Sequence, residues 1–223
     1  MTADVQDVLS EVAPPADAAC RHLGCVHQPT EDVCTLASVV TLVRVVGCLA
    51  LTMASIATGH EALLLAGLAV HCIGDIADGA IARRRTEETR AGAVLDIVGD
   101  RLCIAVYYVS FGQLHHDLLL PVALFLFTFM VLDAHLSLTF LSWPLMSLNY
   151  FGTVDRGLYR WNWSPLAKGC HGGLLPALML TTRSATLCTA VAVGLLAVKA
   201  ASLVRLLGRG VPAPAGCAAA VTS

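Results

Sequence analysis

Residues 75–100 read DIADGAIARRRTEETRAGAVLDIVGD, and this stretch sets charged side chains within otherwise apolar sequence. Two pairs of aspartates, Asp75 with Asp78 and Asp96 with Asp100, flank a basic turn. The apolar residues around both pairs are typical of helices that cross a membrane. A charged side chain at the centre of a bilayer costs at least about 2.5 kcal/mol, so acids in this position indicate a function or a specific partner.

The whole chain is strongly apolar. Of its 223 residues, 57% are hydrophobic and 13% are charged, and the mean hydropathy is +0.73. These values predict an integral membrane protein, because soluble domains of this length are more polar. The formal net charge of -2 gives no basic bias and argues against a nucleic-acid partner. The nine cysteines are an odd number and lie mostly in apolar runs, so they do not indicate a disulfide framework.

Apolar segments close to the ~20 residues needed to cross a bilayer recur six times. They lie at 36–58, 61–82, 92–113, 118–141, 166–182 and 185–207. We therefore expect an all-α polytopic membrane protein with six transmembrane helices, within a domain over residues 33–209. Residues 1–32 are expected to form a flexible cytoplasmic extension, and residues 210–223 a flexible tail.

The N-terminal extension contains a short cluster of thiols and imidazoles: Cys20, His22, Cys25 and His27. Zinc ligands usually come in separated pairs, whereas these four are crowded into eight residues. We interpret the cluster as part of the mobile extension rather than as a zinc site.

Lysine and arginine residues gather at alternate ends of the expected spans, and such residues favour the cytoplasmic side. They follow the second, fourth and sixth spans: Arg83, Arg84, Arg85 and Arg90; Arg156, Arg160 and Lys168; Arg205 and Arg209. This pattern predicts a multi-pass protein of the cell membrane with both termini, and the turn between the aspartate pairs, in the cytoplasm.

The spacing of the aspartates predicts one shared site. Asp75 and Asp78 are three residues apart, and Asp96 and Asp100 are four apart, so each pair occupies one helix face. A short turn joins the two helices, so the pairs converge at a similar depth. Four adjacent carboxylates repel one another, and Mg²⁺ or Mn²⁺ prefers such oxygen ligands. We expect the four to hold two ions, an arrangement suited to phosphoryl chemistry.

Other residues of the stretch suit a diphosphate ligand. Gly79 lacks a side chain where a nucleotide or a helix would approach closely, and Gly92 lies one turn before Asp96 on the same face. Ala82 keeps this surface shallow. The guanidinium of Arg83 can donate two parallel hydrogen bonds to phosphate oxygens.

Together these positions form the pattern D-x2-D-G-x2-A-R-x8-G-x3-D-x3-D, with every fixed position filled. The pattern resembles the signature of the CDP-alcohol phosphatidyltransferase family, class I. Upstream, Thr41 and Arg44 match an N-x-x-T-x-x-R element of many members, and Ser38 stands at its asparagine position.

The resemblance implies a six-helix membrane fold, usually a homodimer, with a polar cavity open to the cytoplasm. It implies that the four aspartates hold two divalent ions and that Asp100 is the general base. It places the CDP moiety against Gly79 and Arg83, beside Ala82 and Gly92. The implied reaction is attack of an acceptor hydroxyl on the β-phosphorus of a CDP-linked lipid, with release of CMP.

The acceptor is expected to meet cations outside the signature, namely Arg44, Arg156, Arg160 and Lys168. Arg44 would bind an acceptor phosphate or, alternatively, pair with an aspartate. The other three would select an anionic acceptor or simply mark the membrane interface. With CDP-diacylglycerol as donor, glycerol 3-phosphate is our first choice of acceptor. Inositol phosphate and phosphatidylglycerol remain alternatives, as does diacylglycerol attacking a CDP-linked small alcohol.

Two other functions compete with this interpretation. A transporter would use the acids for ion passage, and a structural protein would use them in ion pairs. Prenyltransferases also bind diphosphates through aspartates, but they usually have more spans and two separated motifs. Elsewhere, Asp133 and His135 are two residues apart and are not expected to share a face. Arg101 is expected to point away from Asp100, toward packing contacts or a polar partner.

Overall fold

The computed structural model describes residues 34–85, 88–143 and 145–210, and every regular element in these ranges is helical. The expected N-terminal extension with its Cys/His cluster, and nearly all of the C-terminal tail, lie outside the described residues. The five longest helices are α2 (Leu36–Thr58), α3 (Glu61–Arg85), α4 (Arg90–Leu114), α8 (Pro165–Thr182) and α9 (Ala185–Arg209). The others are η1 (His116–Leu118), α5 (Leu119–Phe127), η2 (Thr128–Asp133), α6 (Ala134–Leu138), η3 (Thr139–Ser142), η4 (Leu148–Thr153) and α7 (Arg156–Asn162).

All six expected apolar segments are helical. Four stretches are long and apolar enough to cross a membrane: α2, α3, the run from η1 to η3, and α9. Charged side chains lower the hydropathy of α4, and Lys168 and His171 lower that of α8. The all-α membrane class is confirmed, whereas the spanning role of α4 and α8 stays a prediction.

In α2 the outward face is apolar and the inward face is polar. In α2 the buried side chains recur every three or four residues and are polar or small: Ser38, Thr41, Arg44, Cys48, Thr52 and Ser55. The opposite face carries Val43 and Val46, which are 67% and 65% exposed. This pattern is typical of a helix whose outer face contacts lipid and whose polar groups are satisfied inside the bundle.

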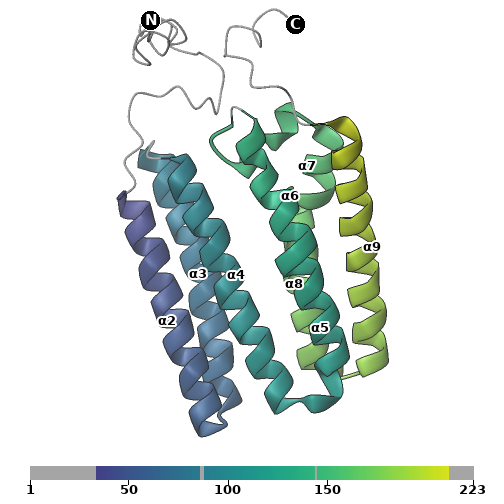
Figure 1. Ribbon diagram of the computed structural model, residues 1–223. Coiled ribbons are helices and arrows are strands. Elements are labelled where there is room, and N and C mark those ends of the chain that lie inside the picture. The colour runs from purple at the N-terminus through teal and green to yellow at the C-terminus, as the bar shows by residue number, and fades with distance from the viewer. Residues whose placement is uncertain (1–33, 86–87, 144, 211–223) are drawn as a thin grey trace, which may run out of the picture.

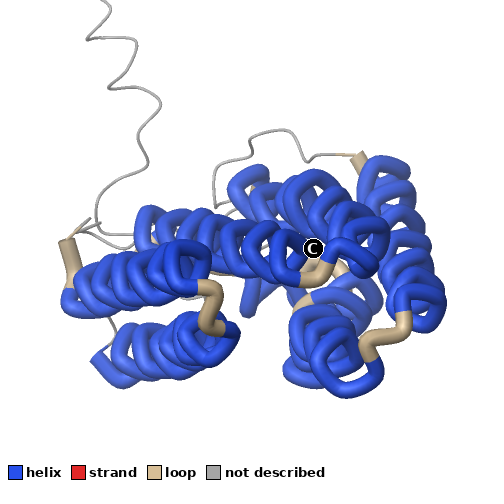
Figure 2. Tube along the Cα trace, turned by 90° about the horizontal axis from the view of Figure 1, so that it is seen from below, coloured by secondary structure: helices blue, strands red, loops and turns tan. Residues whose placement is uncertain are grey.

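The helices pack side by side in two groups (Figure 1). In the first group, α2, α3 and α4 contact one another. In the second, α5 and α8 pack against α9, and α4 also touches α5 and α6. Figure 2 looks along the bundle from the end where α2 turns into α3, and shows short turns between neighbouring helices.

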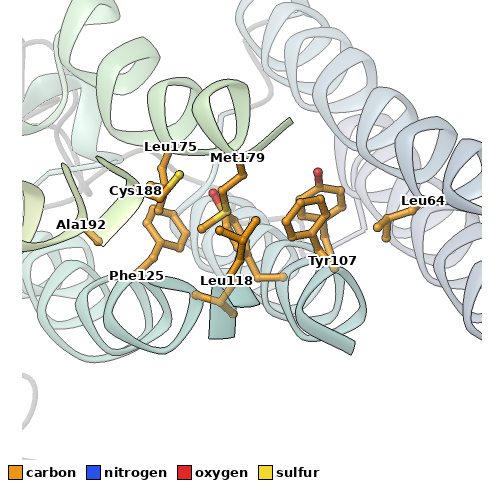
Figure 3. Close-up of a cluster of buried hydrophobic side chains, with 11 residues drawn as sticks. Leu64, Tyr107, Leu118, Phe125, Leu175, Met179, Cys188 and Ala192 are labelled. Carbon is orange, nitrogen blue, oxygen red and sulfur yellow. The ribbon is translucent and has the colours of Figure 1, made fainter. Parts of the chain in front are cut away.

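An aromatic and aliphatic core joins α4 to the second group (Figure 3). Tyr107 of α4 and Phe125 of α5 are buried here with Met179 of α8 and Ala192 of α9. The ring of Tyr108 stacks on that of Phe125 with centroids 4.4 Å apart. This core fixes the second group against α4, the helix that carries Asp96 and Asp100.

Short polar residues define where the site-bearing helices begin. Thr35 precedes α2 and accepts a hydrogen bond from the backbone N–H of Ser38 at 3.1 Å. Thr89 precedes α4 and accepts from the N–H of Gly92 at 2.9 Å. Both caps satisfy backbone donors that the first helical turn leaves unpaired.

Candidate active site

The structure brings the four signature aspartates together. Asp75 and Asp78 lie on α3, and Asp96 and Asp100 lie on α4. Carboxylate oxygens of Asp75, Asp78 and Asp96 all lie within 4.8 Å of one another. The Asp78 side chain is 5% exposed, whereas those of Asp75 and Asp96 are 45% and 39% exposed. The cluster is therefore buried at Asp78 and accessible at Asp75 and Asp96.

Residues of α2 complete the cluster. The Thr41 hydroxyl donates to Oδ2 of Asp78 at 2.8 Å. One turn further along, Arg44 donates to Asp75 at 3.1 Å, and to both Asp96 and Asp100 at 2.8 Å. Its Nε lies 3.5 Å from Asp78 Oδ2, a distance that makes an ion pair but not a well-aligned hydrogen bond. Of the two interpretations of Arg44, the structure shows the pairing with aspartates, here with all four.

The donor set suits a divalent metal ion. Arg44 binds only Oδ1 of Asp75, Asp96 and Asp100. Among the described residues, nothing donates a hydrogen bond to the second oxygen of these three carboxylates. Hard cations prefer clustered carboxylate oxygens of this kind. Oxygens of Asp75, Asp78 and Asp96 lie close enough together to hold one ion, and the role of Asp100 as a fourth ligand stays a prediction.

A cavity of about 470 Å³ opens beside the cluster. Its first wall contains Asp75, Asp78 and Asp96, together with the other signature residues Gly79, Ala82, Arg83 and Gly92. Asp100 is not among the lining residues, because it lies one helical turn below Asp96. The four residues expected to meet the CDP moiety thus share a surface with the upper carboxylates.

The two signature glycines have different neighbours. A Cβ at Gly79 would lie 3.1 Å from Nη1 of Arg83, so the glycine leaves room for that guanidinium to lie over the helix. A Cβ at Gly92 would lie 2.9 Å from Oγ1 of Thr89, the residue that caps α4. Both glycines therefore keep local polar groups in place at the cavity wall.

The facing wall comes from residues 147–168. Lys168 lines the cavity, and its Nζ donates to Oδ1 of Asn149 at 3.3 Å. Trp163 is also a lining residue, and its buried indole N–H has no partner among the described residues. Arg156 and Arg160 are exposed and do not line the cavity. Of the three cations expected between spans four and five, the structure brings only Lys168 to the site.

A second buried charge cluster was not predicted as a unit. Asp133 pairs with Arg101 of α4 at 2.8 Å and with Lys199 of α9 at 2.6 Å. Lys199 also donates to Asn162, at the end of α7, at 3.1 Å. Of the two alternatives for Arg101, packing or a polar partner, the structure shows a polar partner, Asp133. His135 is exposed. The signal in the sequence was three charged residues within apolar segments, which rarely occur without partners.

Two side chains outside the apolar stretches have shifted pKa values. Burial alone would raise the pKa of Asp155, but it is lowered overall by hydrogen bonds from the Leu158 N–H and Arg205 and by the charge of Arg209. The hydrogen bond from the Tyr150 hydroxyl to Glu88, 2.6 Å long, raises the pKa of Tyr150 to about 12. Glu88 lines the cavity, so this bond fixes part of its rim.

Fold and site together define a helical membrane protein with a carboxylate cluster on the wall of a cavity. Comparison with protein families narrows this class. The model of the CDP-alcohol phosphatidyltransferase family matches residues 34–206, so the chain belongs to that family. Members transfer phospholipid head groups from CDP-alcohols and use a divalent metal. Searches among curated proteins and among solved structures found no match.

Proposed function

We propose that this protein transfers a phosphatidyl group from CDP-diacylglycerol to a hydroxyl acceptor and releases CMP. The observation that carries the proposal is the convergence of seven of the eight signature residues on one cavity, where three carboxylates and Arg83 share a wall. A nucleotide-linked diphosphate needs such a combination of cation-binding acids and a fixed guanidinium.

Each residue has a role in the proposed reaction. Two Mg²⁺ or Mn²⁺ ions, held by Asp75, Asp78, Asp96 and Asp100, would supply charge stabilisation to the diphosphate and to the leaving CMP. Arg83 binds phosphate oxygens of the donor, and the flat surface at Gly79, Ala82 and Gly92 accommodates its cytidine side. These groups orient the β-phosphorus toward the facing wall of the cavity.

Asp100 is the proposed general base. It accepts the proton of the acceptor hydroxyl as the oxygen attacks the β-phosphorus, and the bond between that phosphorus and the oxygen bridging to CMP breaks. Support comes from the Asp100 side chain, which keeps 29% of its surface exposed although Arg44 binds its Oδ1. Among the described residues, none donates a hydrogen bond to its Oδ2.

Glycerol 3-phosphate is the proposed acceptor, with inositol phosphate and phosphatidylglycerol as alternatives. Lys168 supplies one positive charge in the cavity wall, and Asn149, its hydrogen-bond partner, lines the same cavity. A phosphate monoester matches both groups. Purified protein with CDP-diacylglycerol and a panel of acceptors, scored by CMP release, tests this choice directly.

The proposed setting is the cell membrane, with six spans and the cavity facing the cytoplasm. Support comes from the arginines of the α3–α4 turn, which lies at the cavity end of these helices. We also propose a homodimer, as the family resemblance implies.

Replacing Asp100 tests the mechanism. We expect Asp100→Asn to lower the rate of CMP release by about 10²–10⁴-fold, because the amide cannot accept the acceptor proton. Metal-dependent binding of CDP-diacylglycerol should persist, since Asp75, Asp78 and Asp96 are unchanged. His135→Ala, at an exposed site outside the cavity, is the control and should keep the wild-type rate.

The same experiment separates an enzyme from an ion transporter. A protein that uses the acids only for ion passage would release no CMP in either form. An Asp100→Asn variant with unchanged turnover would remove Asp100 from the role of base.

A further inference from the structure

Arg44 lies at the centre of the acidic cluster. Its side chain is 1% exposed, and its three nitrogens face carboxylates from two other helices. The distances to Asp75, Asp96 and Asp100 are those of charge-assisted hydrogen bonds. No other cation among the described residues forms an ion pair with these four acids.

The neighbouring helices leave room for this arginine. A Cβ at Gly74 of α3 would lie 2.5 Å from Cδ of Arg44, where no side-chain carbon fits. On α4, a Cβ at Gly99 would lie 2.9 Å from Cγ2 of Val45. Gly74 thus lets α3 pack directly on the arginine, and Gly99 lets α4 pack on the neighbouring Val45, so the position of Arg44 is fixed by packing and not only by charge.

The charges explain why such a group is needed. Four carboxylates and one guanidinium leave a formal charge of -3 in the interior of a helical bundle. Without Arg44 the charge would be -4, and the carboxylates would repel one another with nothing to hold them together. The same negative charge attracts divalent ions. Arg44 carries a positive charge, as the ions do, so it weakens the attraction between the ions and the carboxylates.

We infer that Arg44 is a built-in counter-ion that stands in for the metal. It holds the four carboxylates together when no metal is bound, and it weakens metal binding so that the ions can exchange. Arg44 is therefore a positioning residue and not an acceptor ligand. This inference rests on the metal site of the proposed function.

The test compares Arg44→Gln with wild-type protein in detergent, using Mn²⁺ as the probe. In the presence of a chelator, we expect a lower Tm for the variant, because its carboxylates are no longer neutralised. Saturating Mn²⁺ should raise the Tm of the variant much more than that of the wild type. Mn²⁺ binding, followed by electron paramagnetic resonance, should tighten by about tenfold or more.

Arg101→Gln is the matched control. Arg101 is also a buried arginine, but its carboxylate partner, Asp133, lies outside the acidic cluster. This variant should lose stability equally with chelator and with Mn²⁺. A similar Mn²⁺ rescue of both variants would overturn the inference, as would Arg44→Gln with wild-type Tm in chelator or with unchanged Mn²⁺ affinity.

If Arg44→Gln does not fold, Arg44→Lys takes its place. A single ammonium cannot contact four carboxylates, so the rise in Tm on adding Mn²⁺ should still exceed that of the wild type, and an equal rise would overturn the inference. The proposed function can be rejected independently of the role of Arg44. Tighter Mn²⁺ binding by the variant, with no CMP release by the wild type from any CDP-linked substrate, would support the counter-ion and reject the reaction.

Discussion

At position 74 the chain has no room for a side chain. The site at which a Cβ would stand lies within 2.8 Å of three carbons of Arg44, the nearest being Cδ at 2.5 Å. Relief would require α2 and α3 to separate or Arg44 to move away from the carboxylates. A helical glycine therefore determines where a catalytic-site arginine can lie.

Gly74→Ala should therefore destabilise the protein by about 1–3 kcal/mol, the usual cost of forcing an extra carbon into a packed interior. The measurement is unfolding by heat or by denaturing detergent, in mild detergent micelles. Gly194→Ala is the control, because a Cβ there meets nothing within 4 Å. Equal stability of both variants would show that the α2–α3 contact is loose at this point.

At the residue scale, the sequence predicted the clustering of the four aspartates better than the contacts of Arg44 with them. The i, i+3 and i, i+4 spacings are enough to place each aspartate pair on one helix face. The convergence of α3 and α4 followed from the short turn between them. Which acids Arg44 contacts depends on how α2 packs against α3 and α4, and helical periodicity does not predict that packing. Lys168 and Arg156 could not be separated either, because the sequence does not predict how the short helices η4 and α7 turn relative to α8.

At the scale of helices, Asp133 joins three elements. It ends the π-helical segment η2 and binds Arg101 of α4 and Lys199 of α9. Through Lys199 and Asn162 the cluster reaches α7, next to Trp163 in the cavity wall. The helix that carries Asp96 and Asp100 is thus tied to the wall that faces them.

Asp133→Asn should destabilise the protein by about 3–5 kcal/mol, because it leaves two buried cations without a carboxylate. The free energy of unfolding in detergent measures this loss. His135→Ala, two residues away and exposed, should change it little. A loss no greater than that of the histidine variant would mean that water or lipid head groups neutralise Arg101 and Lys199.

The helices themselves were readily predicted. The six apolar runs matched helices to within a few residues at each end, since length and hydropathy are local properties. The charge cluster of Asp133 was missed because its members are 32 and 66 residues apart along the chain. Each was visible only as an isolated charge in an apolar segment.

At the scale of the whole molecule, Asp155 ties α7 to the end of the chain's last helix. It caps α7 through the N–H groups of Gly157 and Leu158, and it pairs with Arg205 and Arg209 of α9 at 3.1 and 2.8 Å. The side chain of Asp155 is only 2% exposed. These contacts close the end of the bundle at which the cavity opens.

The lowered pKa of Asp155 predicts sensitivity to acid. The unfolded chain takes up a proton near the ordinary aspartate pKa of 3.8, whereas the folded protein does so only at lower pH. The stabilisation from Asp155 is therefore complete above that pH and is lost as pH falls through the folded value. Asp155→Asn should unfold with a weaker pH dependence below pH 5. The exposed Asp117→Asn variant should follow the wild type, and parallel curves for all three would contradict the prediction.

The two walls of the cavity come from separate segments of the chain. Carboxylates and signature residues come from positions 75–96, and the opposite side comes largely from positions 147–168. Substitutions within the later segment can therefore reshape the side of the cavity at which the proposed acceptor would bind, while the carboxylate wall stays unchanged.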